Sequence, residues 1–276
     1  MRAPGWACAA VLSAVGAMFA APAPGPGGGA STEFVAIPAG TFVMGGDTAH
    51  DPLAFDNERW SAGQGQGIVD LPLFYISRHE VTVGAFAAFV HATTWPVDRR
   101  AIDAPPTHPV AYVSWPDALA YCRWLQATLK ASAEIPAETA RRLREGWHVT
   151  LPTEAQWEKA ARGPDGRIYP WGDALRTDRA TFARAGPVPV GHACPECAHG
   201  LSDMAGNVWE WTRSPYQPYP YNDADDRVSL DGEALWVIRG GAFSDQARMI
   251  RASARGAAEP GARRPFIGFR VALVAK

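Results

Sequence analysis

Residues 200–211 read GLSDMAGNVWEW, in which a glycine-containing turn leads into a strand-like segment. Alternation in NVWEW places Val208 and Glu210 toward one side of the strand, and Trp209 and Trp211 toward the other. A tight turn with Gly206 can offer backbone carbonyls beside carboxylates, which suits a hard cation such as calcium. The stretch therefore predicts a cation-binding turn, or a turn in which the carboxylates only accept backbone hydrogen bonds.

Two helices are predicted before this stretch by the residues that begin them. Ser114 precedes Asp117 by three residues, and Thr153 precedes Gln156 by three, which is the spacing of a capping box. Gly163 is typical of a helix terminator. An apolar stripe follows the first of these starts at helical spacing, at Ala118, Tyr121, Cys122, Leu125 and Leu129. Cys122 is therefore expected in the core.

The other elements are a mixture of strands and helices. The segment 34–46, FVAIPAGTFVMGG, predicts a hairpin around a Pro-Ala-Gly turn. Residues 70–93 predict a strand that runs into a helix, and residues 137–145 predict a short charged helix. Beyond Gly163 the helical pattern stops, and loops and short strands rich in Gly, Pro and Trp follow. The pattern indicates mixed α and β structure with many loops.

The composition and the N-terminal segment limit the partners and the cellular location expected of the protein. Lysine and arginine number 26 against 28 acidic residues, which leaves no broad basic surface for nucleic acid. Residues 1–21 resemble a secretory signal peptide, and residues 22–33 would form a flexible leader before a domain at 34–276. The apolar run within residues 1–21 is shorter than a helix needs to span a membrane. We therefore expect a periplasmic or secreted protein with no stable membrane anchor after cleavage.

The loop HACPECAH, residues 192–199, holds four side chains of metal-ligand type, at His192, Cys194, Cys197 and His199. Disulfides persist outside the cytoplasm, so export favours a disulfide between Cys194 and Cys197. A metal site formed with one or both histidines, or thiol redox activity, are the alternatives.

Eight ordered segments together resemble the sulfatase-modifying-factor family, whose best-known members are the formylglycine-generating enzymes. The segments are FVAIPAGTFVMGG (34–46), EVTVGAFAAF (80–89), PVAYVSWPDALAYCRWL (109–125), LPTEAQWEKAARG (151–163), YPWGD (169–173), GLSDMAGNVWEW (200–211), IRGGAF (238–243) and IGFRVAL (267–273). The resemblance covers essentially the whole predicted domain. It implies an α+β fold, an elaborated C-type-lectin-like arrangement with much irregular structure.

The resemblance also implies a copper site that this chain does not match. Formylglycine-generating members hold copper with two cysteines between the Arg-Gly-Gly and Gly-Phe-Arg strands, but residues 240–270 contain no cysteine here. The two ligand positions fall near Asp245 and Ala247. The family's substrate groove would include Trp209, Ala242 and Phe266. We therefore expect no copper-dependent formylglycine generation.

A structural calcium ion is the second implication of the resemblance. In the family its ligands fall on the Asp203 and Glu210 side chains and on the Gly206 and Val208 carbonyls. A second calcium site of some relatives is not expected, because the segment ATFARAGPVP (180–189) is shortened.

Several functions remain open within this family. Sulfoxide synthases carry iron-binding histidines on a separate N-terminal helical domain. Only about a dozen residues separate the predicted signal peptide from the first strand, so we do not expect this chain to belong to that branch. Exported branches without the copper cysteines resemble maturation factors for the siderophore pyoverdine and proteins encoded beside nitrite reductases. We expect an exported accessory factor that binds a peptide, protein or small metabolite. The alternatives are an oxidoreductase with a rebuilt copper or iron site and, third, a true formylglycine-generating oxidase that acts on sulfatases.

Overall fold

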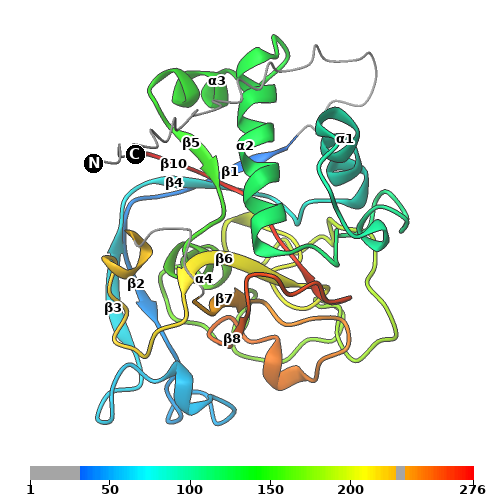
Figure 1. The fold of residues 1–276 in the computed structure, drawn as a ribbon. Coiled ribbons are helices and arrows are strands. Elements are labelled where there is room, and N and C mark those ends of the chain that lie inside the picture. The colour runs from blue at the N-terminus through cyan, green and yellow to red at the C-terminus, as the bar shows by residue number, and fades with distance from the viewer. Residues whose placement is uncertain (1–31, 228–233) are drawn as a thin grey trace, which may run out of the picture.

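The computed structural model describes residues 32–227 and 234–276 (Figure 1). The predicted signal peptide and nearly all of the predicted leader lie outside these residues. Within the described part of the chain, no helix is both long enough and apolar enough to cross a membrane.

The first sheet joins the two ends of the domain. Its strands are β1 (Phe34–Ile37), β4 (Phe74–Ser77), β10 (Ala272–Val274) and β5 (His148–Thr150), in the order β1-β4-β10-β5, with every neighbour antiparallel. Figure 1 shows α2 crossing above this sheet, with α1 and α3 on the same side. These helices span Val83–Thr93 (α1), Trp115–Ala131 (α2) and Ala137–Arg144 (α3).

The predicted hairpin over residues 34–46 is wrong. Strand β2 (Gly40–Met44) pairs with β3 (Gly67–Leu71) in a separate two-stranded sheet, while β1 pairs with β4. The chain leaves the first sheet after Pro38, and Gly40 takes a φ of +127°, a conformation that glycine adopts easily. The local pattern identified both strands but not their partners.

The third sheet carries the WEW stretch. Its strands β6 (Trp209–Pro215), β7 (Trp236–Arg239), β8 (Arg255–Ala258) and β9 (Ile267–Gly268) lie in the order β8-β7-β6-β9. Helix α4 (Glu154–Arg162) packs against β2, β6 and β7. Irregular segments connect these elements, with 3₁₀ turns among the described residues at Asp56–Glu58, Arg99–Ala101, Ala198–Gly200, Asp225–Arg227 and Ala247–Met249.

Both predicted helix starts are confirmed. The Ser114 hydroxyl accepts from the Asp117 amide at 3.3 Å, and the Asp117 carboxylate accepts from the Ser114 amide at 2.9 Å. Thr153 and Gln156 form the same reciprocal pair at 3.1 and 2.9 Å. Gly163 ends α4 with a φ of +68°. These caps satisfy amide groups that the first turn of a helix leaves without partners.

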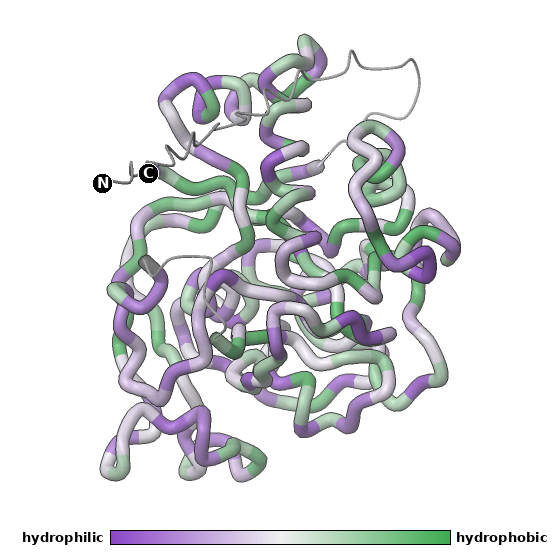
Figure 2. Tube along the Cα trace, viewed as in Figure 1, coloured by the Kyte–Doolittle hydropathy of each residue, from purple (hydrophilic) through white to green (hydrophobic). Residues whose placement is uncertain are grey.

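The core fills the space between the helices and the sheets. Cys122 is a free cysteine buried in the cluster formed by α1, α2 and strands of the first and third sheets, as predicted. A second cluster lies where α4 meets β2, β3 and the first sheet. Figure 2 shows hydrophobic residues concentrated on these inner elements, whereas the loop between β2 and β3 is mostly polar. The first cluster includes Trp209 and Trp211 of β6, and the second includes Leu201 and Met204 of the turn before it.

Candidate functional site

The turn before β6 is fixed by a glycine that no other residue can replace without strain. Gly206 has a φ of +83°, and a Cβ atom there would lie 2.0 Å from the Thr181 carbonyl oxygen. Its amide donates to the Gly240 carbonyl at 2.8 Å. Asp203 and Asn207 also have positive φ, at 59° and 64°. The turn therefore has one conformation, which positions Asp203 before the strand and Glu210 within it.

Glu210 is fully buried and lies against Arg270. The Arg270 guanidinium donates from Nε to Oε2 at 2.6 Å and from Nη2 to Oε1 at 2.7 Å. The Trp157 indole also donates to Oε2, at 2.7 Å. A carboxylate has about four acceptor positions, so these three bonds leave Glu210 about one for any further ligand.

Asp203 connects the turn to the loop that precedes it. Its Oδ2 accepts from the Gly191 amide at 2.6 Å and from the His192 amide at 3.3 Å. Burial raises the pKa of this carboxyl group, while the two amides and the Arg270 charge oppose that shift. The backbone hydrogen bonds expected of a purely structural turn are thus present, and among the described residues Oδ1 takes no hydrogen bond.

Glu80 joins these groups, and the sequence patterns did not single it out. It is 1% exposed, and within the described residues neither of its side-chain oxygens has a hydrogen-bond partner. Burial raises its pKa well above the ordinary value, the nearby Asp203 and Glu210 charges raise it further, and Arg270 lowers it. The sequence signal was only a charged residue between the apolar strand β4 and the apolar face of α1.

The residues predicted to line a substrate groove do come together, but most of them are buried. Trp209 is 5% exposed and Ala242 is fully buried, whereas Asp245, Ala247 and Phe266 are partly exposed. The Asp245 Oδ2 accepts from the Trp209 indole at 2.8 Å and from the Ala242 amide at 2.9 Å. Burial raises the pKa of Asp245, and these two hydrogen bonds oppose the shift.

This arrangement does not fit a copper ion of the kind that the resemblance implies. Cu(I) prefers soft thiolate ligands, whereas the first position holds a carboxylate and the second holds the methyl group of Ala247. In the described ranges 32–227 and 234–276, no group of three His, Cys, Asp or Glu side chains is arranged to hold a metal ion.

The predicted disulfide between Cys194 and Cys197 is confirmed, with Cα atoms 5.2 Å apart. Both sulfur atoms are used in this bond, so neither is a thiolate ligand in this structure. His192 Nε2 lies 3.0 Å from the Asp178 carbonyl, and His199 Nε2 is buried with no partner in the part of the chain that the structure describes. The loop is therefore closed by a disulfide, and it leads into Asp203.

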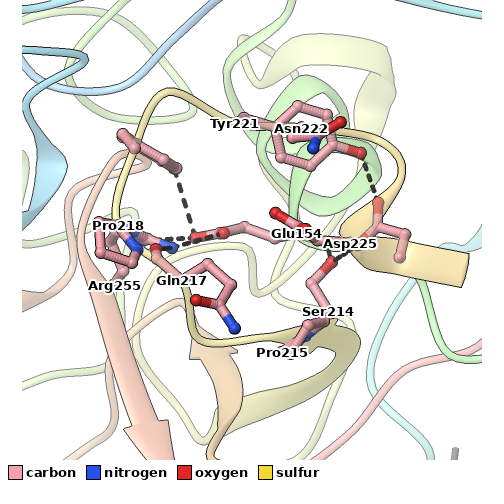
Figure 3. Close-up of a pocket in the computed structure, with 11 residues that line it drawn as sticks. Glu154, Ser214, Pro215, Gln217, Pro218, Tyr221, Asn222, Asp225 and Arg255 are labelled. Atoms are coloured by element: carbon pink, nitrogen blue, oxygen red, sulfur yellow. Dashed lines mark hydrogen bonds and ion pairs between the residues drawn. The ribbon is translucent and has the colours of Figure 1, made fainter. Parts of the chain in front are cut away.

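A separate hollow lies where α4 begins and β6 ends (Figure 3). The Glu154 carboxylate at its wall accepts two hydrogen bonds from Arg255, at 2.7 and 2.8 Å. Asp226 accepts from the hydroxyl groups of Ser214 and Tyr221. Glu154 is thus paired with a charged partner, whereas Asp226 is held by two neutral hydroxyl groups.

The fold and these segments define the chain as a member of the sulfatase-modifying-factor family. A model of the sulfatase-modifying factor enzyme 1-like domain matches residues 20–275. Residues 32–227 and 234–276 form four α-helices and several small sheets, similar to solved members, which confirms the predicted α+β class.

Relatives within the family carry different names. The chain is 32% identical over 281 residues to a hercynine oxygenase of Mycolicibacterium thermoresistibile, which covers 84% of this chain and 56% of that protein. It is 30% identical over 310 residues to a formylglycine-generating enzyme of Thermomonospora curvata, covering 86% and 92%. The chain spans little more than half the length of the hercynine oxygenases it matches.

Solved structures show the same fold. PvdO from Pseudomonas aeruginosa is 26% identical, with a TM-score of 0.69 over 88% of this chain and 94% of that one. CarF is 24% identical, with a TM-score of 0.60 over 89% and 99%, and supports the fold alone.

Proposed function

We propose that this protein is an exported accessory or maturation factor of the family, which binds a peptide, protein or small metabolite without copper-dependent formylglycine chemistry. Its predicted signal peptide supports export, and the absence of cysteine from residues 240–270 supports a function without the copper site. Relatives named formylglycine-generating enzyme share the scaffold, but function depends on the site carried by a scaffold.

One observation carries the proposal. The Asp245 carboxylate lies near the first copper position and is held by the Trp209 indole and the Ala242 amide. Those two donors fix a hard oxygen ligand where the reaction of the relatives needs a soft thiolate. Ala247, two residues along the chain, and Phe266, whose carbonyl accepts from the Trp209 amide, are partly exposed.

Metal analysis of protein purified from the periplasm tests the proposal. We expect no near-stoichiometric copper or iron in the wild-type protein, and no change in metal content in Cys194→Ser, because both loop sulfurs are disulfide-bonded. Turnover of a cysteine-containing sulfatase peptide provides the second readout. Copper bound near stoichiometrically, together with oxidation of the peptide cysteine, would overturn the proposal.

A metal-dependent oxidoreductase with a rebuilt site is the second candidate. The names of the curated relatives favour it, since both hercynine oxygenase and formylglycine-generating enzyme denote enzymes. Iron or copper that is present in wild-type protein and lost in Cys194→Ser would favour this candidate over the accessory factor.

A structural calcium ion at Asp203, Glu210 and the carbonyls of Gly206 and Val208 is part of the proposal. The donor set is suitable because calcium accepts carboxylate and carbonyl oxygens in flexible geometry. Asp203→Asn is the better test variant, because Glu210 also neutralises a buried arginine. We expect calcium to raise the melting temperature of the wild-type protein and to have little effect on Asp203→Asn.

A further inference from the structure

Asp245 is a partly buried carboxylate that has no cation near it. Burial raises its pKa, and the groups that lower it are the Ala242 amide and the Trp209 indole, both of which are neutral. Burial also raises the pKa values of other carboxyl groups in this protein, but there an arginine charge acts in the opposite direction, at Asp203, Glu210 and Asp226. Within residues 32–227 and 234–276, Asp245 therefore lacks the counter-charge that buried carboxylates normally have.

One oxygen of Asp245 is open to a ligand. The Trp209 indole and the Ala242 amide both donate to Oδ2, at 2.8 and 2.9 Å. Oδ1 has no hydrogen-bond partner in the described part of the chain and, unlike the oxygens of Glu80, it is not fully buried. The two N–H donors also favour the ionised form of the carboxyl group. A charged acceptor atom is therefore accessible at the surface of this site.

The backbone and the indole together fix the direction of this oxygen. The Asp245 amide donates to the Ala242 carbonyl at 3.0 Å, and its carbonyl accepts from the Ala183 amide at 2.9 Å. Trp209, which holds the carboxylate, is itself buried. Ala183 has a φ of 51°, a conformation that is uncommon for alanine. The carboxylate is thus held in place before any ligand binds, which lowers the entropic cost of binding.

A positively charged organic group suits Oδ1 better than a metal ion does. A calcium ion takes six to eight oxygen ligands, and the described side chains include no group of three His, Cys, Asp or Glu arranged to hold a metal ion. An ammonium or guanidinium group needs only one acceptor here, because the rest of its molecule can make contacts elsewhere. A hydrogen bond from a charged donor to a carboxylate is about twice as strong as one between neutral groups.

We propose that Asp245 binds the ammonium or guanidinium group of the ligand, so that the ligand is a lysine- or arginine-containing peptide segment or a small amine. This inference rests on the proposed function and names the ligand chemistry for the same site. The ligand supplies the counter-charge that the chain itself does not place beside Asp245. A ligand that is neutral at this point leaves the carboxylate without one and binds more weakly.

The test uses both sources of the cationic group at pH 8. A synthetic random peptide library with acetylated N-termini is selected against wild-type protein, Asp245→Asn and Asp56→Asn. Asp56→Asn is the matched control, because it removes the same charge from an exposed position. Cadaverine and agmatine are titrated against the same proteins by calorimetry, with pentane-1,5-diol as the neutral analogue.

We expect the wild-type protein and Asp56→Asn to select peptides with lysine or arginine at one fixed position, and Asp245→Asn to lose that preference. A selected peptide should bind Asp245→Asn at least about tenfold more weakly than wild-type, because the charge-assisted hydrogen bond is lost. Norleucine in place of the basic residue should weaken binding to the wild-type protein equally and make no further difference to Asp245→Asn. For a small amine, cadaverine or agmatine should bind the wild-type protein and the diol should not.

Several results would overturn the inference. Selected peptides without a basic residue at a fixed position, or losses from norleucine and from Asp245→Asn that add, remove the cationic chemistry and leave a protein that binds ligands. Absence of both peptide enrichment and amine binding also overturns it, and the metal and turnover assays above decide the proposed function separately. If Asp245→Asn does not fold, unchanged binding of the norleucine peptide to the wild-type protein contradicts the inference.

Discussion

Arg270 and Glu210 form a two-point ion pair in which neither side chain is exposed, with nitrogen-to-oxygen distances of 2.6 and 2.7 Å. The pair connects β6 to the segment just before β10, and so it joins the third sheet to the first. The charged network around it is part of the core rather than of the surface.

Removal of Arg270 should therefore be severely destabilising. Arg270→Ala leaves Glu210 buried without its partner, and loss of one member of a buried pair costs about 3–5 kcal/mol. Urea unfolding monitored by tryptophan fluorescence measures the loss. Arg99→Ala is the control, because Arg99 forms an exposed pair with Asp103 at 3.9 Å, and should change stability by less than about 1 kcal/mol. Equal losses of unfolding free energy in the two variants would show that the buried pair contributes no more to stability than the exposed pair.

The turn should not tolerate a side chain at Gly206. In Gly206→Ala the new methyl group would meet the Thr181 carbonyl, and φ at this position is positive. We expect a loss of more than about 1 kcal/mol, seen as a lower melting temperature. Gly186→Ala adds the same methyl group where no atom lies within 4 Å. A Gly206→Ala protein as stable as Gly186→Ala would contradict the fixed turn.

The Cys194–Cys197 disulfide should stabilise the protein only modestly. It closes a very short loop, and the entropic gain grows with loop length, so the double variant Cys194→Ala/Cys197→Ala should lose about 2 kcal/mol or less. Chemical denaturation with and without reductant measures this. Reductant should lower the stability of the wild-type protein to that of the double variant and leave the double variant unchanged. If reductant also lowers the stability of the double variant, the effect does not come from this disulfide.

Asp245→Asn should make the protein more stable at neutral pH. Burial raises the pKa of Asp245 above the ordinary value of 3.8, so folding favours the protonated form. The cost of ionisation is absent below that ordinary value, grows as pH rises through the folded-state pKa, and is constant above it. The gain in unfolding free energy of Asp245→Asn should therefore be absent at low pH and grow as pH rises. Urea unfolding from pH 3 to pH 8 measures it. Asp56→Asn, at an exposed position, controls for net charge; a gain independent of pH would contradict this account.

Local signals in the sequence predicted the elements better than their pairing. The caps at Ser114 and Thr153, the end at Gly163 and the core position of Cys122 depend on neighbours within a few residues, and all are confirmed. The hairpin at 34–46 failed because strand partners depend on contacts with β4 and β3, far along the chain.

The candidate site shows the same limit. The resemblance assigned Trp209, Ala242 and Asp245 to one pocket, and in the structure Asp245 accepts hydrogen bonds from the Trp209 indole and the Ala242 amide. It did not predict that Trp209 and Ala242 would be buried, nor that Glu80 would be buried close enough to Arg270 for the two charges to interact. Those properties arise from packing between segments that no local spacing relates.

The place of β10 in the first sheet has a consequence for synthesis of the protein. Because β10 lies between β4 and β5, that sheet stays divided until residues 272–274 have been made. Arg270 is made only just before them, so the carboxylates around it lack their counter-charge in every shorter nascent chain. Closure of the first sheet and of the charged network therefore waits until residues 270–274 have been synthesised.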